Sequence, residues 1–97
     1  MNFDYIKDKI KDFISFYNAR FTREICSDDT IFYVLKIEPN IEIHFQVYKE
    51  DKNDVSDNIF ATLCKDKDII YITSDNDIDL IINMFHKDIL EISNATI

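Results

Sequence analysis

Three aspartates at alternate positions, Asp75, Asp77 and Asp79, come nearest to a metal-binding motif in this sequence. An EF-hand loop places oxygen ligands at its positions 1, 3 and 5, a glycine at position 6 and a bidentate glutamate at position 12. Counted from Asp75, position 6 is Leu80 and position 12 is His86, so the residues for the sharp turn and the bidentate ligand are both missing. We therefore expect no metal, and interpret the three carboxylates as residues of a first helical turn, where the helix dipole favours negative charge.

The two histidines and two cysteines supply the other groups with ligating or nucleophilic chemistry. We expect His44 on the outer face of a strand, and His86 near the end of a helix, where a cation is favoured. Cys26 and Cys64 lie 38 positions apart and outside any Cys-x-x-Cys pattern, so the sequence predicts two reduced, mostly buried thiols. The spacing of these four residues predicts no metal site.

The chain contains no glycine, although an average soluble protein has about 7%. Glycine lets a backbone approach a phosphate or turn through positive φ without a steric penalty. Its absence excludes the glycine-rich phosphate loop, the dinucleotide fingerprint and the G-x-S-x-G nucleophile elbow. A cysteine–histidine pair or a pair of carboxylates that meet in space stays open, because nineteen acidic residues guarantee some neighbours. We expect no catalytic residue, no cofactor and no enzyme activity.

Charge is the strongest functional signal, because the 97 residues carry a net charge of −8. Residues 1–25 hold five basic and four acidic residues, a net of +1, whereas residues 26–97 hold six basic and fifteen acidic residues, a net of −9. Such a surface repels nucleic acid and phosphorylated substrates. Carboxylates on a rigid domain can instead imitate nucleic-acid phosphates and occupy a basic groove of another protein. The alternative is that the acids only maintain solubility.

The acidic residues that we expect to bind a partner lie in one polar segment and in one turn: Glu50, Asp51, Asp54, Asp57, Asp66 and Asp68. The first four belong to residues 49–58, the only long polar stretch, which the sequence predicts as an exposed loop. Tyr33, Tyr48 and Tyr71 are candidate aromatic anchors for the same partner, although tyrosine is also common in strands.

Two amphipathic helices must position these side chains. The first is predicted by apolar residues at helical spacing, and it should end near residues 18–20: Phe3, Ile6, Ile10, Phe13 and Tyr17. The second is predicted by a similar stripe: Ile78, Ile81, Ile82, Phe85 and Ile89. Ser74 and Asp77 have the spacing of a capping box at its start.

The middle of the chain is rich in predicted strands. A short strand near residues 21–27 precedes two hairpins, 31–38 with 41–49 and 59–64 with 69–73. Strict alternation of apolar and polar residues over 41–48 is typical of a half-buried antiparallel strand. We predict one small acidic α+β domain over residues 1–97, with a four-stranded, mainly antiparallel sheet flanked by an N-terminal and a C-terminal helix.

In size and charge, this glycine-free chain is similar to phage inhibitors of host nucleases, among them anti-CRISPR and DNA-mimic proteins, and to immunity proteins that neutralise basic toxins. The likeness involves no shared motif, so it implies no site residue. The charged N-terminus lacks the apolar core of a signal peptide. We therefore predict a cytoplasmic inhibitor, in the host cytoplasm if a phage encodes it, that binds a basic protein surface, without direct contact to nucleic acid or a membrane.

A dimeric interaction module, such as a small secretion-type chaperone, is the alternative function. Its sheet edges or apolar helix faces would pair with a second copy or with an extended client segment.

Overall fold

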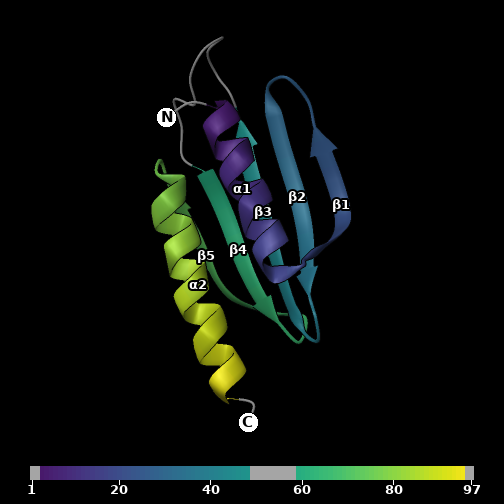
Figure 1. Cartoon of the computed structure of the whole chain (residues 1–97), viewed down its shortest axis with the longest axis vertical. Helices are drawn as coiled ribbons and strands as arrows, with labels where there is room; N and C mark the ends of the chain where they lie inside the picture. The colour runs from purple at the N-terminus through teal and green to yellow at the C-terminus, as the bar shows by residue number, and fades with distance from the viewer. Residues whose placement is uncertain (1–2, 49–58, 96–97) are drawn as a thin grey trace.

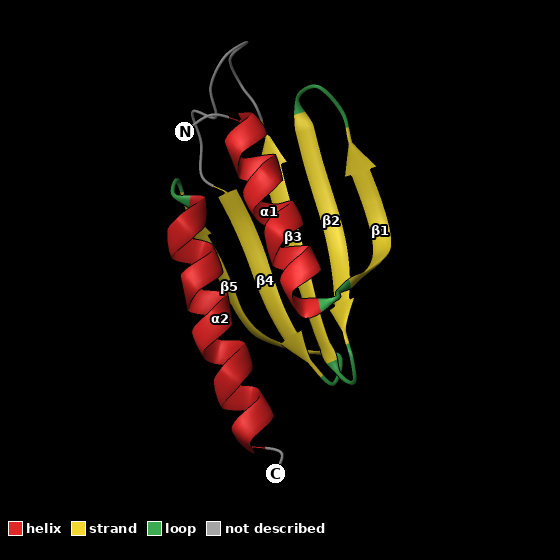
Figure 2. Cartoon of the chain, viewed as in Figure 1, coloured by secondary structure: helices red, strands yellow, loops and turns green. Residues whose placement is uncertain are grey.

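The computed structural model describes residues 3–48 and 59–95, in which both helices lie on one face of an antiparallel sheet (Figures 1 and 2). Along the chain, the elements are α1 (Phe3–Tyr17), β1 (Arg20–Cys26), β2 (Thr30–Ile37), β3 (Ile41–Tyr48), β4 (Ile59–Lys65), β5 (Asp68–Asp75) and α2 (Ile78–Ala95). The five strands lie in chain order, and each pairs antiparallel with the next. The predicted α+β fold is confirmed, with five strands instead of four because β1 joins the sheet beside β2.

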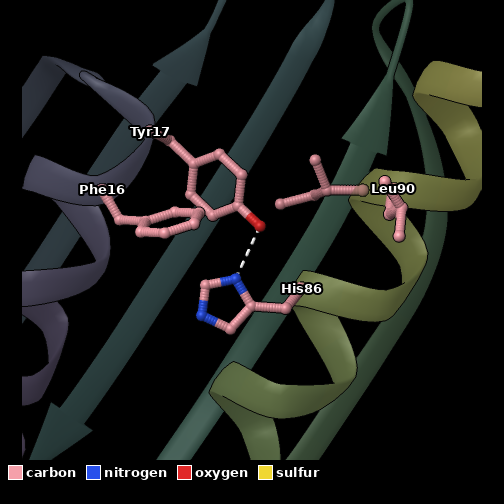
Figure 3. A pocket seen from close by; sticks show the side chains of 5 residues that line it. Phe16, Tyr17, His86 and Leu90 are labelled. Atoms are coloured by element: carbon pink, nitrogen blue, oxygen red, sulfur yellow. Dashed lines mark hydrogen bonds between the residues drawn. The ribbon is translucent and has the colours of Figure 1, made fainter.

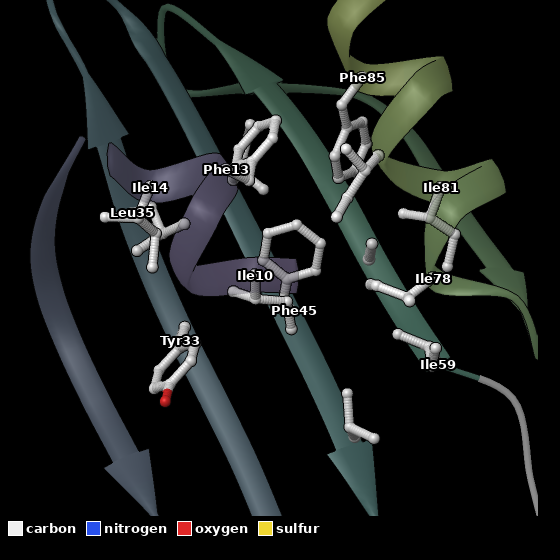
Figure 4. Packing of buried hydrophobic residues seen from close by; sticks show 14 of the residues in the cluster. Ile10, Phe13, Ile14, Tyr33, Leu35, Phe45, Ile59, Ile78, Ile81 and Phe85 are labelled. Atoms are coloured by element: carbon white, nitrogen blue, oxygen red, sulfur yellow. The ribbon is translucent and has the colours of Figure 1, made fainter. Parts of the chain in front are cut away.

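Alternating side chains of the strands form the core under the helices. Phe45 of β3 lies at its centre, with its ring centroid 5.8 Å from Phe13 of α1 and 5.6 Å from Phe85 of α2 (Figure 4). Tyr33 of β2 and Leu63 of β4 are fully buried on the same face. The stripes predicted for the two helices are therefore the surfaces that pack on the sheet.

Three of the described residues take the positive-φ conformation that glycine usually supplies. Asn18 (φ 51°) follows α1, and the amide of Ala19 donates to the carbonyl of Ile14 at 2.9 Å, as in a Schellman motif. Asp66 (φ 53°) and Lys67 (φ 72°) form the two-residue turn between β4 and β5, as in a type I′ hairpin. The end of α1 and the β4–β5 turn are thus formed by residues whose Cβ is sterically disfavoured there.

The start of α2 differs from the predicted capping box. Ser74 belongs to β5, and the N-cap is Asp77, whose carboxylate accepts a hydrogen bond of 3.0 Å from the amide of Asp79. Asp75 ends β5, and its carboxylate accepts a hydrogen bond of 2.9 Å from the amide of Asp77. Only Asp79 lies in the first helical turn. The prediction is wrong because β5 extends two residues beyond the expected strand.

Candidate functional site

The six residues predicted to bind a partner flank strand β4. Four of them lie outside the described residues: Glu50, Asp51, Asp54 and Asp57. The other two, Asp66 and Asp68, lie at the turn between β4 and β5. Strand β4 runs from Ile59 to Lys65, so this turn lies roughly 20 Å from the start of that strand.

Asp66 and Asp68 lie at the end of the sheet that also holds the β2–β3 connection. We refer to this end as the turn end, and its described charges balance. Asp66 accepts a hydrogen bond of 3.0 Å from the Asn40 amide group, and Arg20 contacts Glu38 at 3.1 Å. The described strand ends and turns here hold four basic and four acidic residues: Arg20, Lys36, Lys65, Lys67, Glu38, Glu42, Asp66 and Asp68. Negative charge is therefore not in excess around the two predicted residues.

The opposite end of the sheet gathers carboxylates. Its described strand ends and connections, together with the first turn of α2, hold five aspartates, and Lys9 of α1 contacts the last of them: Asp28, Asp29, Asp75, Asp77 and Asp79. The strand register places them at the same end of the sheet. Thr30, which follows Asp28 and Asp29, pairs with Tyr48 at the end of β3, and Asp75 pairs with Ile59 at the start of β4. We refer to these five aspartates as the acidic end, which is uppermost in Figure 1.

Hydrogen bonds hold the carboxylates of the acidic end in place. Asp29 accepts a hydrogen bond of 2.9 Å from the hydroxyl of Ser27. Asp79 accepts one of 2.5 Å from the hydroxyl of Tyr5 and lies 3.7 Å from the Lys9 ammonium group. Both helices begin at this end (Figure 1), so their positive N-termini offset part of the repulsion between the carboxylates.

The three candidate aromatic anchors have different environments. Tyr48 is exposed, whereas Tyr33 is fully buried on the helix-facing side of β2, so it cannot anchor a partner. Tyr71 is half-buried on the helix-facing side of β5, and its hydroxyl donates a hydrogen bond to Asp88 of α2. Burial, reinforced by this bond, raises the pKa of Tyr71 and keeps its phenol neutral.

A pocket of about 400 Å³ opens between the end of α1 and α2 (Figure 3). The hydroxyl of Tyr17 and Nδ1 of His86 share a hydrogen bond of 2.6 Å, and burial raises the pKa of Tyr17. The exposed side chains of Phe16 and Leu90 also line the pocket. The expected position of His86 near a helix end is wrong, because α2 continues to Ala95. The lining has no serine, thiol or carboxylate that this histidine could activate as a nucleophile.

His44 lies on the helix-free side of β3, as predicted, with Nε2 at 3.1 Å from Glu42 Oε1. Both cysteines are free thiols, but only Cys64 is buried, so the prediction is wrong for the exposed Cys26. Burial, and then the charge of Glu42, raise the pKa of the Cys64 thiol. Across residues 3–48 and 59–95, no three histidine, cysteine or acidic side chains are placed to hold a metal ion.

Comparisons with protein-family models, curated proteins and solved structures find no match to this chain. Neither described helix is long and apolar enough to cross a bilayer. The structural features that bear on function are therefore the acidic end, the interhelical pocket and the helix-free face of the sheet.

Proposed function

We propose that this protein is a non-enzymatic inhibitor that docks its acidic end into the basic groove of a nucleic-acid-handling protein, such as a nuclease. The observation that carries the proposal is the polarised charge of the sheet. One end presents five aspartates, of which Asp79 contacts Lys9 of α1, whereas the turn end holds equal numbers of basic and acidic residues. A basic groove would therefore bind one end of this molecule in preference to the other.

The way in which these carboxylates are held supports binding. Asp29 and Asp79 accept hydrogen bonds from neighbouring side chains, and Asp75 and Asp77 accept them from backbone amides. Side chains that are already ordered lose less conformational entropy on association. Four of the six acidic residues predicted from the sequence, Glu50, Asp51, Asp54 and Asp57, lie outside the described residues and stay a prediction.

The proposed setting is the cytoplasm of the cell that contains the target. A phage protein that blocks a defence nuclease, including an anti-CRISPR protein, and an immunity protein that blocks a basic toxin both suit the same electrostatics. Neither needs a catalytic residue in this chain.

Two variants with equal changes of charge test the proposal. The first removes four charges from the acidic end: Asp28→Asn, Asp29→Asn, Asp75→Asn and Asp77→Asn. The matched control removes four from the turn end: Glu38→Gln, Glu42→Gln, Asp66→Asn and Asp68→Asn. Asparagine keeps the acceptor oxygen at the helix cap, and it tolerates the positive φ of position 66.

Each protein is immobilised and exposed to lysates of candidate host cells, and bound proteins are eluted with a salt gradient. We expect the unchanged protein and the turn-end control to retain a nucleic-acid-binding protein that elutes as salt rises, because screening weakens the contact. The acidic-end variant should lose it, and added protein should inhibit binding of DNA or RNA by the purified target. Equal retention by both variants, or a target whose nucleic-acid binding is unaffected, would contradict the proposal.

A further inference from the structure

The helix-free face of the sheet exposes an unusual number of large apolar side chains. Both helices cover the other face, and the strand register assigns five exposed apolar residues to this one: Ile25, Tyr48, Phe60, Ile69 and Ile72. Phe60 is 45% exposed and Ile72 is 66% exposed. A sheet with water on one side usually carries polar residues there, so this face has the composition of one that another surface covers.

Charge on this face differs from charge on the rest of the molecule. Arg23 and Lys36 are on it, and its described carboxylate is Glu42, which contacts His44 at 3.1 Å. A chain with a net charge of −8 repels a second copy of itself over most of its surface. Contact through the helix-free face keeps the carboxylates of two copies apart, and this argues for a second copy as the occupant.

The area of the face suits a stable dimer. Five strands about 4.8 Å apart, each seven or eight residues long at about 3.3 Å per residue, cover roughly 600 Å². Two such faces bury about 1,200 Å², the lower bound for specific protein–protein interfaces. Edge-to-edge pairing is less suitable, because both edge strands are irregular: the register shifts at Thr22 of β1 and at Ile70 of β5.

The polarised charge also selects an orientation. If a two-fold axis crosses the strands at the middle of the sheet, the acidic end of one copy lies over the turn end of the other. Lys36, a basic residue of that end on the helix-free face, then lies close to the partner's aspartates of the β1–β2 connection. A parallel arrangement would instead bring two acidic ends together.

We propose that two copies of this chain associate face to face and antiparallel through the helix-free faces of their sheets, with the helices on the outside of a four-layer dimer. Asp75 and Asp79 stay accessible at opposite ends of this assembly, because Asp75 pairs with Ile59 of the core face and Asp79 contacts Tyr5 and Lys9 of α1. The dimer is thus independent of the inhibitor function.

Sedimentation velocity across micromolar concentrations, at low and at high salt, tests the dimer. We expect a dimer that persists at high salt, because its interface is mainly apolar. Phe60→Lys with Ile72→Lys should give a folded monomer. The matched control, Phe16→Lys with Leu90→Lys, places the same charges at side chains that are 73% and 63% exposed on the helix side, and it should stay dimeric. A monomeric unchanged protein, or a dimer lost only in the control, overturns the proposal.

A cysteine cross-link tests the orientation. The axis passes near His44, which lies in the middle strand, so His44→Cys in a Cys26→Ser, Cys64→Ala background should form an intermolecular disulfide under mild oxidation. Leu80→Cys, an exposed position on α2, should not. If the protein is a dimer but only the Leu80→Cys variant cross-links, the face-to-face arrangement is wrong. If the unchanged protein is a dimer but retains no target in a salt-sensitive way, the inhibitor function alone is wrong.

Discussion

Tyr33 and Tyr71 point from strands β2 and β5 into the same layer between sheet and helices, but their hydroxyls differ, because that of Tyr71 has a carboxylate as its partner. The hydroxyl of Tyr71 donates to Asp88, whereas that of the fully buried Tyr33 makes no hydrogen bond of normal geometry among the described residues and faces the weakly accepting thiol of Cys26. A buried hydroxyl without a partner is a net cost to the folded state.

The two tyrosines should therefore respond in opposite directions to the same substitution. Tyr33→Phe removes a buried hydroxyl that has no strong acceptor and should raise the free energy of unfolding by about 1 kcal/mol. Tyr71→Phe removes a hydrogen bond to a carboxylate and should lower it by about 1 kcal/mol. Urea denaturation of both variants measures the difference. Destabilisation of both by a similar amount would show that the Tyr33 hydroxyl does have a partner.

The same tyrosines predict a loss of stability at alkaline pH. Burial raises the pKa of both Tyr33 and Tyr71 above the ordinary value of about 10. Above that pH the unfolded chain releases the phenol protons while the folded chain retains them, so the free energy of unfolding falls as pH rises, by up to about 1.4 kcal/mol per pH unit for each group. Below a pH of about 10, the contribution of the two tyrosines to the free energy of unfolding is fully present. Chemical denaturation at a series of pH values should show this slope, and the double Phe variant should have a shallower one.

Lys67 offers a test of the glycine-free turn. Its φ of 72° penalises a residue with a Cβ, so Lys67→Gly should stabilise the β4–β5 hairpin by up to about 1 kcal/mol. The matched control is Lys65→Gly, within β4, which should destabilise the protein because glycine weakens a strand. Thermal unfolding of the two variants compares them. A destabilising Lys67→Gly would mean that the lysine side chain makes a contact that outweighs its strain.

The cap of α2 can be assigned by substitution. Asp77→Ala should cost about 1 kcal/mol, because the amide of Asp79 loses its acceptor. Asp77→Asn should cost less, since asparagine is an equally good cap. Ser74→Ala, in β5, should have almost no effect. Equal losses of unfolding free energy for Ser74→Ala and Asp77→Ala in urea denaturation would show that Ser74 also caps the helix, as the sequence predicted.

The two thiols should react at different rates. Cys26 is exposed, whereas Cys64 is buried and its thiol has a raised pKa, so less of the reactive thiolate forms. We expect a chromogenic disulfide reagent to label Cys26 rapidly and Cys64 slowly at mildly alkaline pH. Cys26→Ser should remove the rapid phase and Cys64→Ala the slow one. A single rate for both cysteines would contradict the burial of Cys64.

The sequence predicts the helices and strands well because their patterns are long and local. The stripe from Phe3 to Tyr17 and the alternation over 41–48 each record which side of an element is buried. The end of β5 was missed because strand pairing with β4, a non-local contact, carries it beyond its apolar run into Ser74 and Asp75. The sequence does not predict the position of His86 correctly, because α2 continues beyond Ile89, where the predicted apolar stripe ends.

Local sequence patterns did not predict which acidic residues lie together at one end of the sheet. Successive connections of an antiparallel meander lie at alternate ends of the sheet. Tyr48, the end of β3, and the turn at Asp66, the end of β4, therefore lie at opposite ends of the sheet. The same rule would have united the β1–β2 connection with the start of α2, where Asp28 and Asp77 lie. The order of the strands, which no local pattern encodes, was the missing information.

Charge gathered at one end of the sheet gives each chain a permanent electric dipole along its strands. A dipole of this kind turns the molecule before contact, within the roughly 8 Å over which charge acts at physiological salt. In an antiparallel pair, the two dipoles oppose each other and cancel. Electric birefringence would then distinguish a strongly orienting monomer from a dimer that hardly orients, although the two carry the same charge per chain.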